Sequence, residues 1–199
     1  MTIKIDERAR GFIFDIDGTL ANTMPIHYQA WCEIAGRYGF DMTEALLYRL
    51  AGMPTGEIVK YINQHQGYNL EVEKITKVKN ETYLRLATSV QLIGPVFKIV
   101  EQYYQKMPMA LGTGEYRDIA MMNIKATGLD KYFDIIVTAD DVKNSKPDPE
   151  TFLKCAEFIG VSPEYCQVFE DAEPGLEAGR KAGMIVTDVR PFLRKDMIA

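Results

Sequence analysis

Short runs of apolar residues recur along the chain, and most of them are separated by stretches with helical periodicity. Five of these runs are bounded by turn-forming residues, which is typical of buried strands. The predicted strands are residues 11–14, 108–111, 133–137, 167–169 and 184–187. From residue 108 onward, strands alternate with helical stretches. This order predicts an α/β fold, in which a Rossmann-like parallel sheet carries helices on both faces.

The helical stretches in the second half of the chain each precede a glycine, a residue that commonly follows the last turn of a helix. They are residues 116–127, 149–159 and 175–182, followed by Gly128, Gly160 and Gly183. At the start of the second stretch, Asp148 is predicted to be the N-cap residue and Pro149 the first helical residue.

Residues 15–107 differ from the rest because they carry helical patterns with almost no strand signal. The predicted helices are residues 25–38, 43–50, 56–64, 72–87 and 96–106. The last of these has the length of an ordinary crossover helix between strands. The other four together are too long for a single connection between two strands. We therefore expect a helical cap of residues 22–91, inserted after the first strand of a core formed by residues 1–21 and 92–199.

The charges of the chain argue against a polyanion as partner. The 199 residues carry a formal net charge of −5, and the predicted cap has seven basic and seven acidic residues. An acidic protein is a poor match for the phosphate backbone of nucleic acid, so we expect no such partner. A neutral insertion is better explained as a lid over the sheet.

Other sequence features narrow the class of protein. The chain has no run of about 18 apolar residues that would span a bilayer, and "MTIKIDERAR" lacks the apolar core of a signal peptide. We therefore expect a cytoplasmic protein without membrane contact. Cys32, Cys155 and Cys166 are widely spaced, which favours reduced thiols over a disulfide framework or a zinc site. No strong apolar stripe is left over for an interface, so we expect a monomer.

Polar residues follow four of the five predicted strands. They are Asp15 and Asp17 after the first, Thr113 and Gly114 after the second, Lys146 in the loop after the third, and Glu170 and Asp171 after the fourth. Because ligands bind at the carboxyl ends of strands in open parallel sheets, we expect these residues to meet. Burying unpaired carboxylates is costly, so the acids in "FIFDIDGTLANT" also predict a bound partner.

The chemistry of this set is that of phosphoryl transfer. Its carboxylates supply hard oxygens, which suit Mg²⁺ rather than zinc. The Thr113 hydroxyl and nearby backbone N–H groups suit phosphate oxygens, and Lys146 supplies the positive charge that a phosphoryl group requires. Each part alone would be explained as a turn, a helix cap or a solvated loop. Their occurrence together at strand ends favours an enzyme with a carboxylate nucleophile.

The order of these motifs resembles the haloacid dehalogenase superfamily over essentially the whole chain. The resemblance rests on D-x-D-G-T-L, a threonine after an apolar strand, K-P, and E-D after a further apolar strand. Within the superfamily, the chain is similar to the β-phosphoglucomutase-like group, and most to the bacterial fructose-1-phosphate phosphatases. The shared stretches are "TMPIHYQAW", "AGMPTGE", "MALGTGE", "SKPDPETF", "VFEDAEPGLEAGRKAGM" and "TDVR". The resemblance implies a small α-helical cap over the core.

The resemblance also implies a role for each matching residue of the core. Asp15 matches the nucleophile, which forms an aspartyl-phosphate, and Asp17 matches the general acid/base. Thr113 and Lys146 match the groups that hold the transferring phosphoryl group. The matching Mg²⁺ ligands are Asp15, Asp17 (through its backbone carbonyl), Glu170 and Asp171. Of these, Glu170 binds either the metal or its water.

In the cap, the resemblance places His27, Trp31 and Lys79 where relatives contact substrate or couple cap closure to the acid/base. Thr55 and Gly114 are further expected substrate contacts. Without the resemblance, His27 would be explained equally well as a packing residue of the cap, and Trp31 would be better explained as part of the cap core. Lys79 would then be part of a solvated helix face.

The predicted function is Mg²⁺-dependent hydrolysis of the phosphate of a small sugar or related metabolite, and a sugar-phosphate mutase is the alternative. A mutase must also hold a second phosphate, for which arginine is the natural residue. β-Phosphoglucomutases have an arginine shortly after the glycine of the cap, where this chain has Thr55. Thr55 cannot supply that charge, although Lys79 or Arg49 could compensate.

Three other functions agree less well with the motifs. A metal-free haloacid dehalogenase would have little use for Asp17 or for the pair of Glu170 and Asp171. A non-catalytic protein on this fold would be expected to lack a nucleophile or metal ligand, and a small cap favours small substrates over nucleotides. Asn22 stands where relatives usually have aspartate. We expect this change to alter hinge hydrogen bonds without stopping the chemistry.

Overall fold

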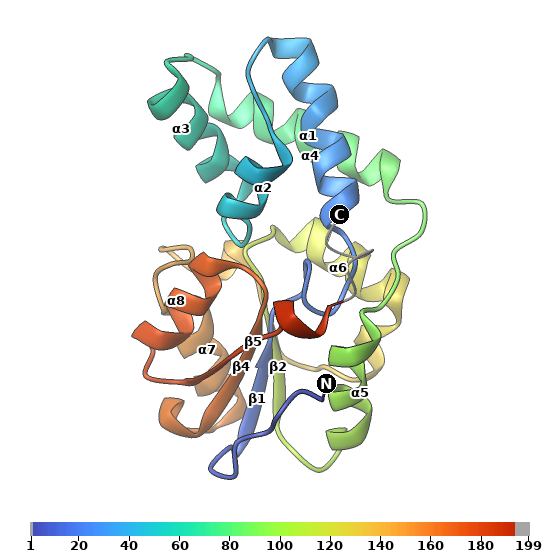
Figure 1. The fold of residues 1–199 in the computed structure, drawn as a ribbon, viewed down its shortest axis with the longest axis vertical. Coiled ribbons are helices and arrows are strands. Elements are labelled where there is room, and N and C mark those ends of the chain that lie inside the picture. The colour runs from blue at the N-terminus through green and yellow to red at the C-terminus, as the bar shows by residue number, and fades with distance from the viewer. Residues whose placement is uncertain (1, 194–199) are drawn as a thin grey trace.

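The computed structural model describes residues 2–193. Within this range, a five-stranded parallel sheet has the strand order β3-β2-β1-β4-β5. The strands are β1 (Gly11–Phe14), β2 (Met109–Gly112), β3 (Ile136–Val137), β4 (Cys166–Glu170) and β5 (Ile185–Asp188). Figure 1 shows helices on both sides of this sheet and a further helical layer above it. The predicted α/β fold is confirmed.

Different helices cover the two faces of the sheet. One face is covered by α5 (Gly94–Tyr103) and α6 (Arg117–Thr127), and the other by α7 (Glu150–Ile159) and α8 (Glu173–Lys181). Within β1, Phe12 and Phe14 pack toward α5 and α6, whereas Ile13 packs toward α7 and α8. This alternation follows from the two-residue period of a strand, and it places β1 between two apolar layers. Short 3-10 turns are η1 (Leu129–Lys131), η2 (Ala139–Asp141), η3 (Pro163–Tyr165) and η4 (Arg190–Phe192).

The structure corrects the predicted boundaries of β3 and α7, among others. The strand predicted at 133–137 is only Ile136–Val137, because Phe133 is buried in the core before the strand begins. As an edge strand, β3 pairs with β2 alone. The prediction of Asp148 as N-cap is wrong by one residue, since α7 begins at Glu150 and Pro149 occupies the N-cap position. Asp148 still accepts a hydrogen bond from the Glu150 N–H at 3.0 Å.

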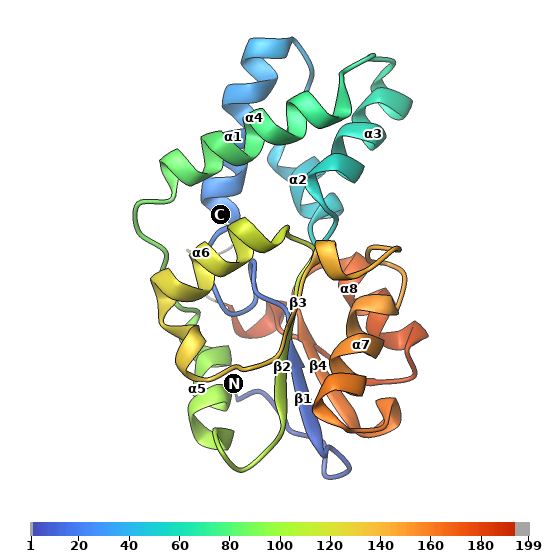
Figure 2. The same cartoon turned by 180° about the vertical axis from the view of Figure 1, so that it is seen from behind.

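A helical layer lies over the carboxyl ends of the strands, as Figures 1 and 2 show from opposite sides. Its helices are α1 (Met24–Tyr38), α2 (Glu44–Leu50), α3 (Thr55–Gln66) and α4 (Val72–Leu86). Their apolar side chains, among them Trp31, Leu47 and Ile62, form a cluster separate from the clusters around the sheet. This layer is the helical insertion that the sequence predicts, and we call it the cap.

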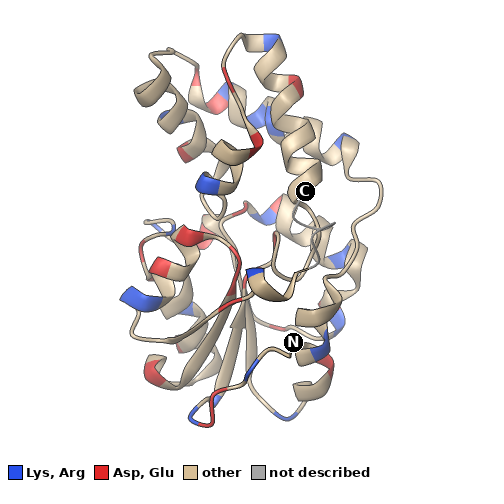
Figure 3. Ribbon diagram, viewed as in Figure 1, with Lys and Arg blue, Asp and Glu red and all other residues tan. Residues whose placement is uncertain are grey.

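The surface of the cap carries charges of both signs. Figure 3 shows Lys and Arg residues interspersed with Asp and Glu on its helices. None of the helices within residues 2–193 has the length and apolar character that a membrane span requires.

The chain passes between sheet and cap at two neighbouring points. Ala21 and Leu92 form an isolated antiparallel bridge. Beside it, the N–H of Asn22 donates to the carbonyl of Gln91 at 2.8 Å. The outgoing and returning connections therefore lie side by side.

Candidate active site

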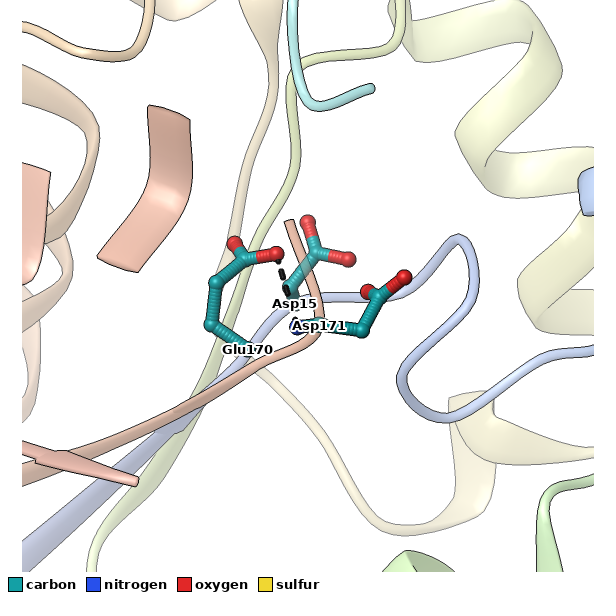
Figure 4. A group of neighbouring side chains, drawn as sticks. All are labelled: Asp15, Glu170 and Asp171. Carbon is teal, nitrogen blue, oxygen red and sulfur yellow. Dashed lines mark hydrogen bonds between the residues drawn. The ribbon is translucent and has the colours of Figure 1, made fainter. Parts of the chain in front are cut away.

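Three buried carboxylates meet where β1 and β4 end, as Figure 4 shows. Asp15 follows β1, Glu170 is the last residue of β4, and Asp171 comes next. Because Phe14 pairs with Phe169 in parallel register, Asp15 and Glu170 leave the sheet side by side. One oxygen atom of each carboxylate lies within 4.8 Å of the other two. The acids are therefore brought together by strand pairing, as the sequence predicts.

Two glycines make room for these carboxylates. A Cβ atom on Gly175 in α8 would lie 1.9 Å from Glu170 Oε2, and one on Gly18 would lie 2.3 Å from Asp171 Oδ2. Gly18 also has a φ of 88°, which favours glycine for backbone reasons. The other oxygen of Glu170, Oε1, accepts hydrogen bonds from the N–H groups of Asp171 and Ala172 at 3.0 and 2.9 Å. Backbone contacts thus hold Glu170 in one position.

Lys146 is the buried cation of this cluster. Its Nζ donates hydrogen bonds to Asp15 Oδ1 at 2.7 Å, to Glu170 Oε2 at 2.8 Å and to the carbonyl of Gly112 at 3.1 Å. Burial alone would lower the pKa of Lys146, but the charges of Asp15 and Glu170 outweigh burial and raise it. Lys146 is therefore a charged ammonium that pairs with two buried carboxylates.

The cluster carries more negative charge than Lys146 balances. Burial and the neighbouring charge of Glu170 raise the pKa of Asp15 well above its usual range, and they raise the pKa of Asp171 to about 7. A divalent cation would relieve this crowding. The three carboxylates provide hard oxygen donors that converge on one place, which is the donor set that Mg²⁺ prefers. The residues present therefore fit a magnesium ion.

Asp17 has a different set of partners. Its Oδ1 accepts hydrogen bonds from the Thr23 hydroxyl at 2.8 Å and from the Asn123 side-chain amide at 3.2 Å, and its Oδ2 accepts one from the Thr113 hydroxyl at 3.3 Å. Burial alone would raise the pKa of Asp17, but the nearby His27 imidazole and the hydrogen bond from Thr23 outweigh burial and lower it. The carboxylate of Asp17 is thus held apart from the cluster of Asp15, Glu170 and Asp171.

On the cap side, Lys79 and His27 form a buried pair beside Asp17. Lys79 Nζ lies 3.1 Å from His27 Nδ1 and 3.3 Å from Glu115 Oε1. His27 Nε2 lies 3.5 Å from Asp17 Oδ1, and the imidazole stacks on the Tyr83 ring at a centroid distance of 4.1 Å. A continuous series of polar contacts therefore joins Asp17 in the core to Lys79 in the cap.

A small cavity lies between the cap and the strand ends. Predicted residues in its walls are Asp15, Asp17, Thr113 and Gly114 from the core, and His27, Trp31 and Lys79 from the cap. Its volume of ≈ 30 Å³ admits a few waters at most, but no sugar phosphate. The cap is therefore closed in this structure. Thr55 lies outside these walls, where its buried hydroxyl donates to Asn80 Oδ1 at 3.3 Å.

Several site residues were not predicted from the sequence. Glu115 enters the cavity wall from the loop after β2, and Thr23 and Asn123 hold the Asp17 carboxylate. Glu115 follows directly after Thr113 and Gly114, so its position at a strand end was a usable signal. Asn123 lies within α6 and has no local sequence signal of a role in the site.

Known proteins resemble this chain over nearly its whole length. Residues 12–189 match the sequence profile of the family Haloacid dehalogenase-like hydrolase. The chain is 41% identical to the fructose-1-phosphate phosphatase YqaB of Escherichia coli over 185 residues, which cover 92% of this chain and 98% of that protein. It is 33% identical to a phosphorylated carbohydrates phosphatase of Thermotoga maritima, over 86% of this chain and 81% of that protein.

A solved structure shares the same architecture. The crystal structure of a β-phosphoglucomutase from Clostridium difficile superposes with a TM-score of 0.78 at 26% sequence identity. The matched region covers 90% of this chain and 84% of that one. Core and cap are therefore both shared with this neighbour.

Proposed function

Because the chain belongs to the haloacid dehalogenase-like hydrolase family, we propose that it is a Mg²⁺-dependent phosphatase that forms an aspartyl-phosphate on Asp15. Its substrate is the phosphate monoester of a small sugar or related metabolite. The observation that carries this proposal is the buried group of Asp15, Glu170, Asp171 and Lys146 at the strand ends. The names of the two phosphatase relatives support a phosphorylated sugar as substrate.

The first step is attack of the Asp15 carboxylate on phosphorus, with cleavage of the bond to the sugar oxygen. Carboxylate and phosphate are both negative, and the ammonium of Lys146, 2.7 Å from Asp15 Oδ1, reduces their repulsion. Mg²⁺ held by Asp15, Glu170, Asp171 and the backbone carbonyl of Asp17 would supply further positive charge to the same end. The Thr113 hydroxyl and the N–H groups after β2 hold the phosphoryl oxygens.

Asp17 carries the protons of both steps. In its protonated form it donates a proton to the sugar oxygen as that oxygen leaves. It then removes a proton from the water that attacks the aspartyl-phosphate, which releases inorganic phosphate and restores Asp15. The hydrogen bonds from Thr23 and Asn123 hold the Asp17 carboxylate in place for both transfers.

Residues 22–91 act as a moving cap in this proposal. The closed cavity is too small for a substrate, so the cap must open to admit one and close to exclude bulk water. The two connecting segments, which pair at Ala21 and Leu92, are the natural hinge, since both links between cap and core pass there.

A β-phosphoglucomutase-type mutase is the alternative, because a protein of that name shares core and cap with this chain. A mutase requires a grip for a second phosphate in the cap. The position where the sequence comparison expects that cation is Thr55, whose hydroxyl is occupied by Asn80. Hydrolysis is therefore the better supported of the two reactions.

The test is release of inorganic phosphate from a panel of phosphate esters, with Mg²⁺ or with EDTA. The panel contains fructose 1-phosphate, glucose 6-phosphate, 6-phosphogluconate, β-glucose 1-phosphate and a nucleoside monophosphate. We expect metal-dependent release from at least one sugar phosphate, and none from the Asp15→Asn variant. Conversion of β-glucose 1-phosphate to glucose 6-phosphate in the presence of a bisphosphate primer, without release elsewhere, would establish the mutase instead.

A further inference from the structure

Glu115 is a carboxylate in the cavity wall that the proposed mechanism does not use. It follows Thr113 and Gly114 at the carboxyl end of β2, and about nine-tenths of its surface is buried, with 9% exposed. Its backbone is held on both sides, since its N–H donates to Thr113 Oγ1 at 3.1 Å and its carbonyl accepts from the Ala139 N–H at 2.9 Å. The side chain therefore projects into the cavity from a fixed base.

The two carboxylate oxygens of Glu115 have different surroundings. Oε1 lies 3.3 Å from the ammonium of Lys79. Oε2 is buried and has no hydrogen-bond partner among residues 2–193. A buried acceptor without a partner costs free energy, so this oxygen is suited to receive a donor from a bound molecule. An uncharged sugar or polyol offers hydroxyl groups as such donors.

Glu115 also determines the charge of the cap side of the cavity. Lys79 is fully buried, and its ammonium is engaged by Glu115 and by His27 Nδ1. An ammonium only donates, so His27 Nδ1 is the acceptor of this hydrogen bond. Lys79 therefore does not present an uncompensated charge to a ligand, and the acid that neutralises it keeps one buried oxygen without a hydrogen-bond partner.

We propose that Glu115 selects substrates by charge, admitting monophosphates whose leaving group is an uncharged sugar or polyol. This inference rests on the proposed phosphatase function. Oε2 accepts a hydrogen bond from a hydroxyl of the leaving group. A second phosphate or a carboxylate on that group would meet an ammonium already neutralised by Glu115 and an acid oxygen that has no proton to donate, so its own charge would stay unpaired in a desolvated cavity. The same neutralisation of Lys79 disfavours the sugar bisphosphate that a mutase must hold.

The experiment compares two ligands that differ in one group at the end remote from the phosphate. Sorbitol 6-phosphate has a neutral alcohol there, and 6-phosphogluconate has a carboxylate of similar size. Glu115→Gln keeps the shape and one hydrogen-bond acceptor of the side chain and removes its charge. Glu81→Gln makes the same change on an exposed residue of α4 and serves as the matched control.

We expect Glu115→Gln to raise kcat/KM for 6-phosphogluconate relative to sorbitol 6-phosphate by at least ~10-fold, whereas Glu81→Gln leaves this ratio unchanged. A merely structural role of Glu115 would change both ligands alike. A ratio that stays within about twofold of the unmodified protein overturns the proposal.

Binding separates this inference from the proposed function. Dissociation constants of both ligands are measured by calorimetry in Asp15→Asn and in Asp15→Asn combined with Glu115→Gln. If the unmodified protein hydrolyses neither ligand, the proposed phosphatase activity toward these two ligands is wrong. The ratio of their dissociation constants still tests charge selection by Glu115. Equal or tighter binding of 6-phosphogluconate with Glu115 intact, or no binding of sorbitol 6-phosphate, overturns the inference.

Discussion

The carbonyl oxygen of Gly52, in the cap loop between α2 and α3, lies only 2.0 Å from the position that a Cβ atom on Gly114 would occupy. Gly114 belongs to the core loop after β2, so the closed cap rests on a place where no side chain fits. The obstacle would be backbone, which cannot rotate away as a side chain can. This contact makes closure of the cap directly testable.

Gly114→Ala is expected to hold the cap partly open. The added methyl group collides with Gly52 only in the closed state, so the open state and the sheet are unaffected. We expect kcat/KM for the sugar phosphate to fall by at least ~10-fold, because closure completes the site, while the melting temperature changes by less than about 4 °C. Gly36→Ala in α1, where a Cβ meets nothing within 4 Å, is the control. Full activity of Gly114→Ala would contradict the closed arrangement.

Lys146→Met is expected to destabilise the metal-free protein strongly. It leaves the buried carboxylates of Asp15 and Glu170 without their cation, and the loss of one partner of a buried ion pair costs about 3–5 kcal/mol. Urea unfolding in EDTA measures this change in the free energy of unfolding. Lys77→Met, on an exposed residue of α4, should stay within about 0.5 kcal/mol of the unmodified protein. Equal effects of the two variants would rule out the buried pair as a source of stability.

Stabilisation by Mg²⁺ is expected to depend on pH through Asp171. Burial and Glu170 raise the pKa of Asp171 from its usual 3.8 to about 7 in the metal-free protein. Between these values the folded state binds a proton that the unfolded state lacks, so this group's contribution to stability in EDTA falls as pH rises. Below about pH 7 that proton competes with the metal.

Thermal unfolding with and without Mg²⁺ tests this dependence. We expect the rise in melting temperature on adding Mg²⁺ to be at least about twice as large at about pH 8 as at about pH 5.5. Asp171→Asn should reduce the rise at both pH values and remove most of the difference between them. The same rise at both pH values in the unmodified protein would show that Asp171 does not compete with protons for the metal.

His27→Gln is expected to move the pH profile of the reaction. The nearby His27 imidazole lowers the pKa of Asp17 against the effect of burial, so loss of the imidazole raises that pKa. The limb of the pH–rate profile set by Asp17 should move to higher pH, with a kcat reduced by roughly 10-fold. His65→Gln is the matched control, because His65 is exposed and stacks on Tyr61 in the cap surface. Superimposable profiles for the two variants would exclude coupling between His27 and Asp17.

The site in the core was predictable because it depends on strand order alone. Residues that directly follow neighbouring parallel strands must meet, so the motifs at Asp15, Thr113 and Glu170 located the site without knowledge of helix packing. The edge strand was predicted too long, since pairing with β2 alone supports only Ile136 and Val137. The apolar residue Phe133 is buried without being in a strand, a distinction that apolar character does not make.

The cap half of the site was less predictable for a physical reason. His27 and Lys79 lie on α1 and α4, and their contact depends on how those two helices are rotated against each other. Sequence periodicity gives the buried face of a helix but not its partner, so only the family resemblance singled out these residues. Thr55 was expected to contact substrate from its place in a motif, yet its hydroxyl is turned to Asn80. The position of Glu115 required the cavity itself.

The bridge between Ala21 and Leu92 also affects how such a protein can evolve. The segment of residues 22–91 leaves and rejoins the core at two points that are neighbours in space, so its two ends lie close together. An inserted segment of different shape can replace it there without a change in the register of the strands. The shape of the cap can therefore change independently of the paired strands that carry Asp15 and Glu170.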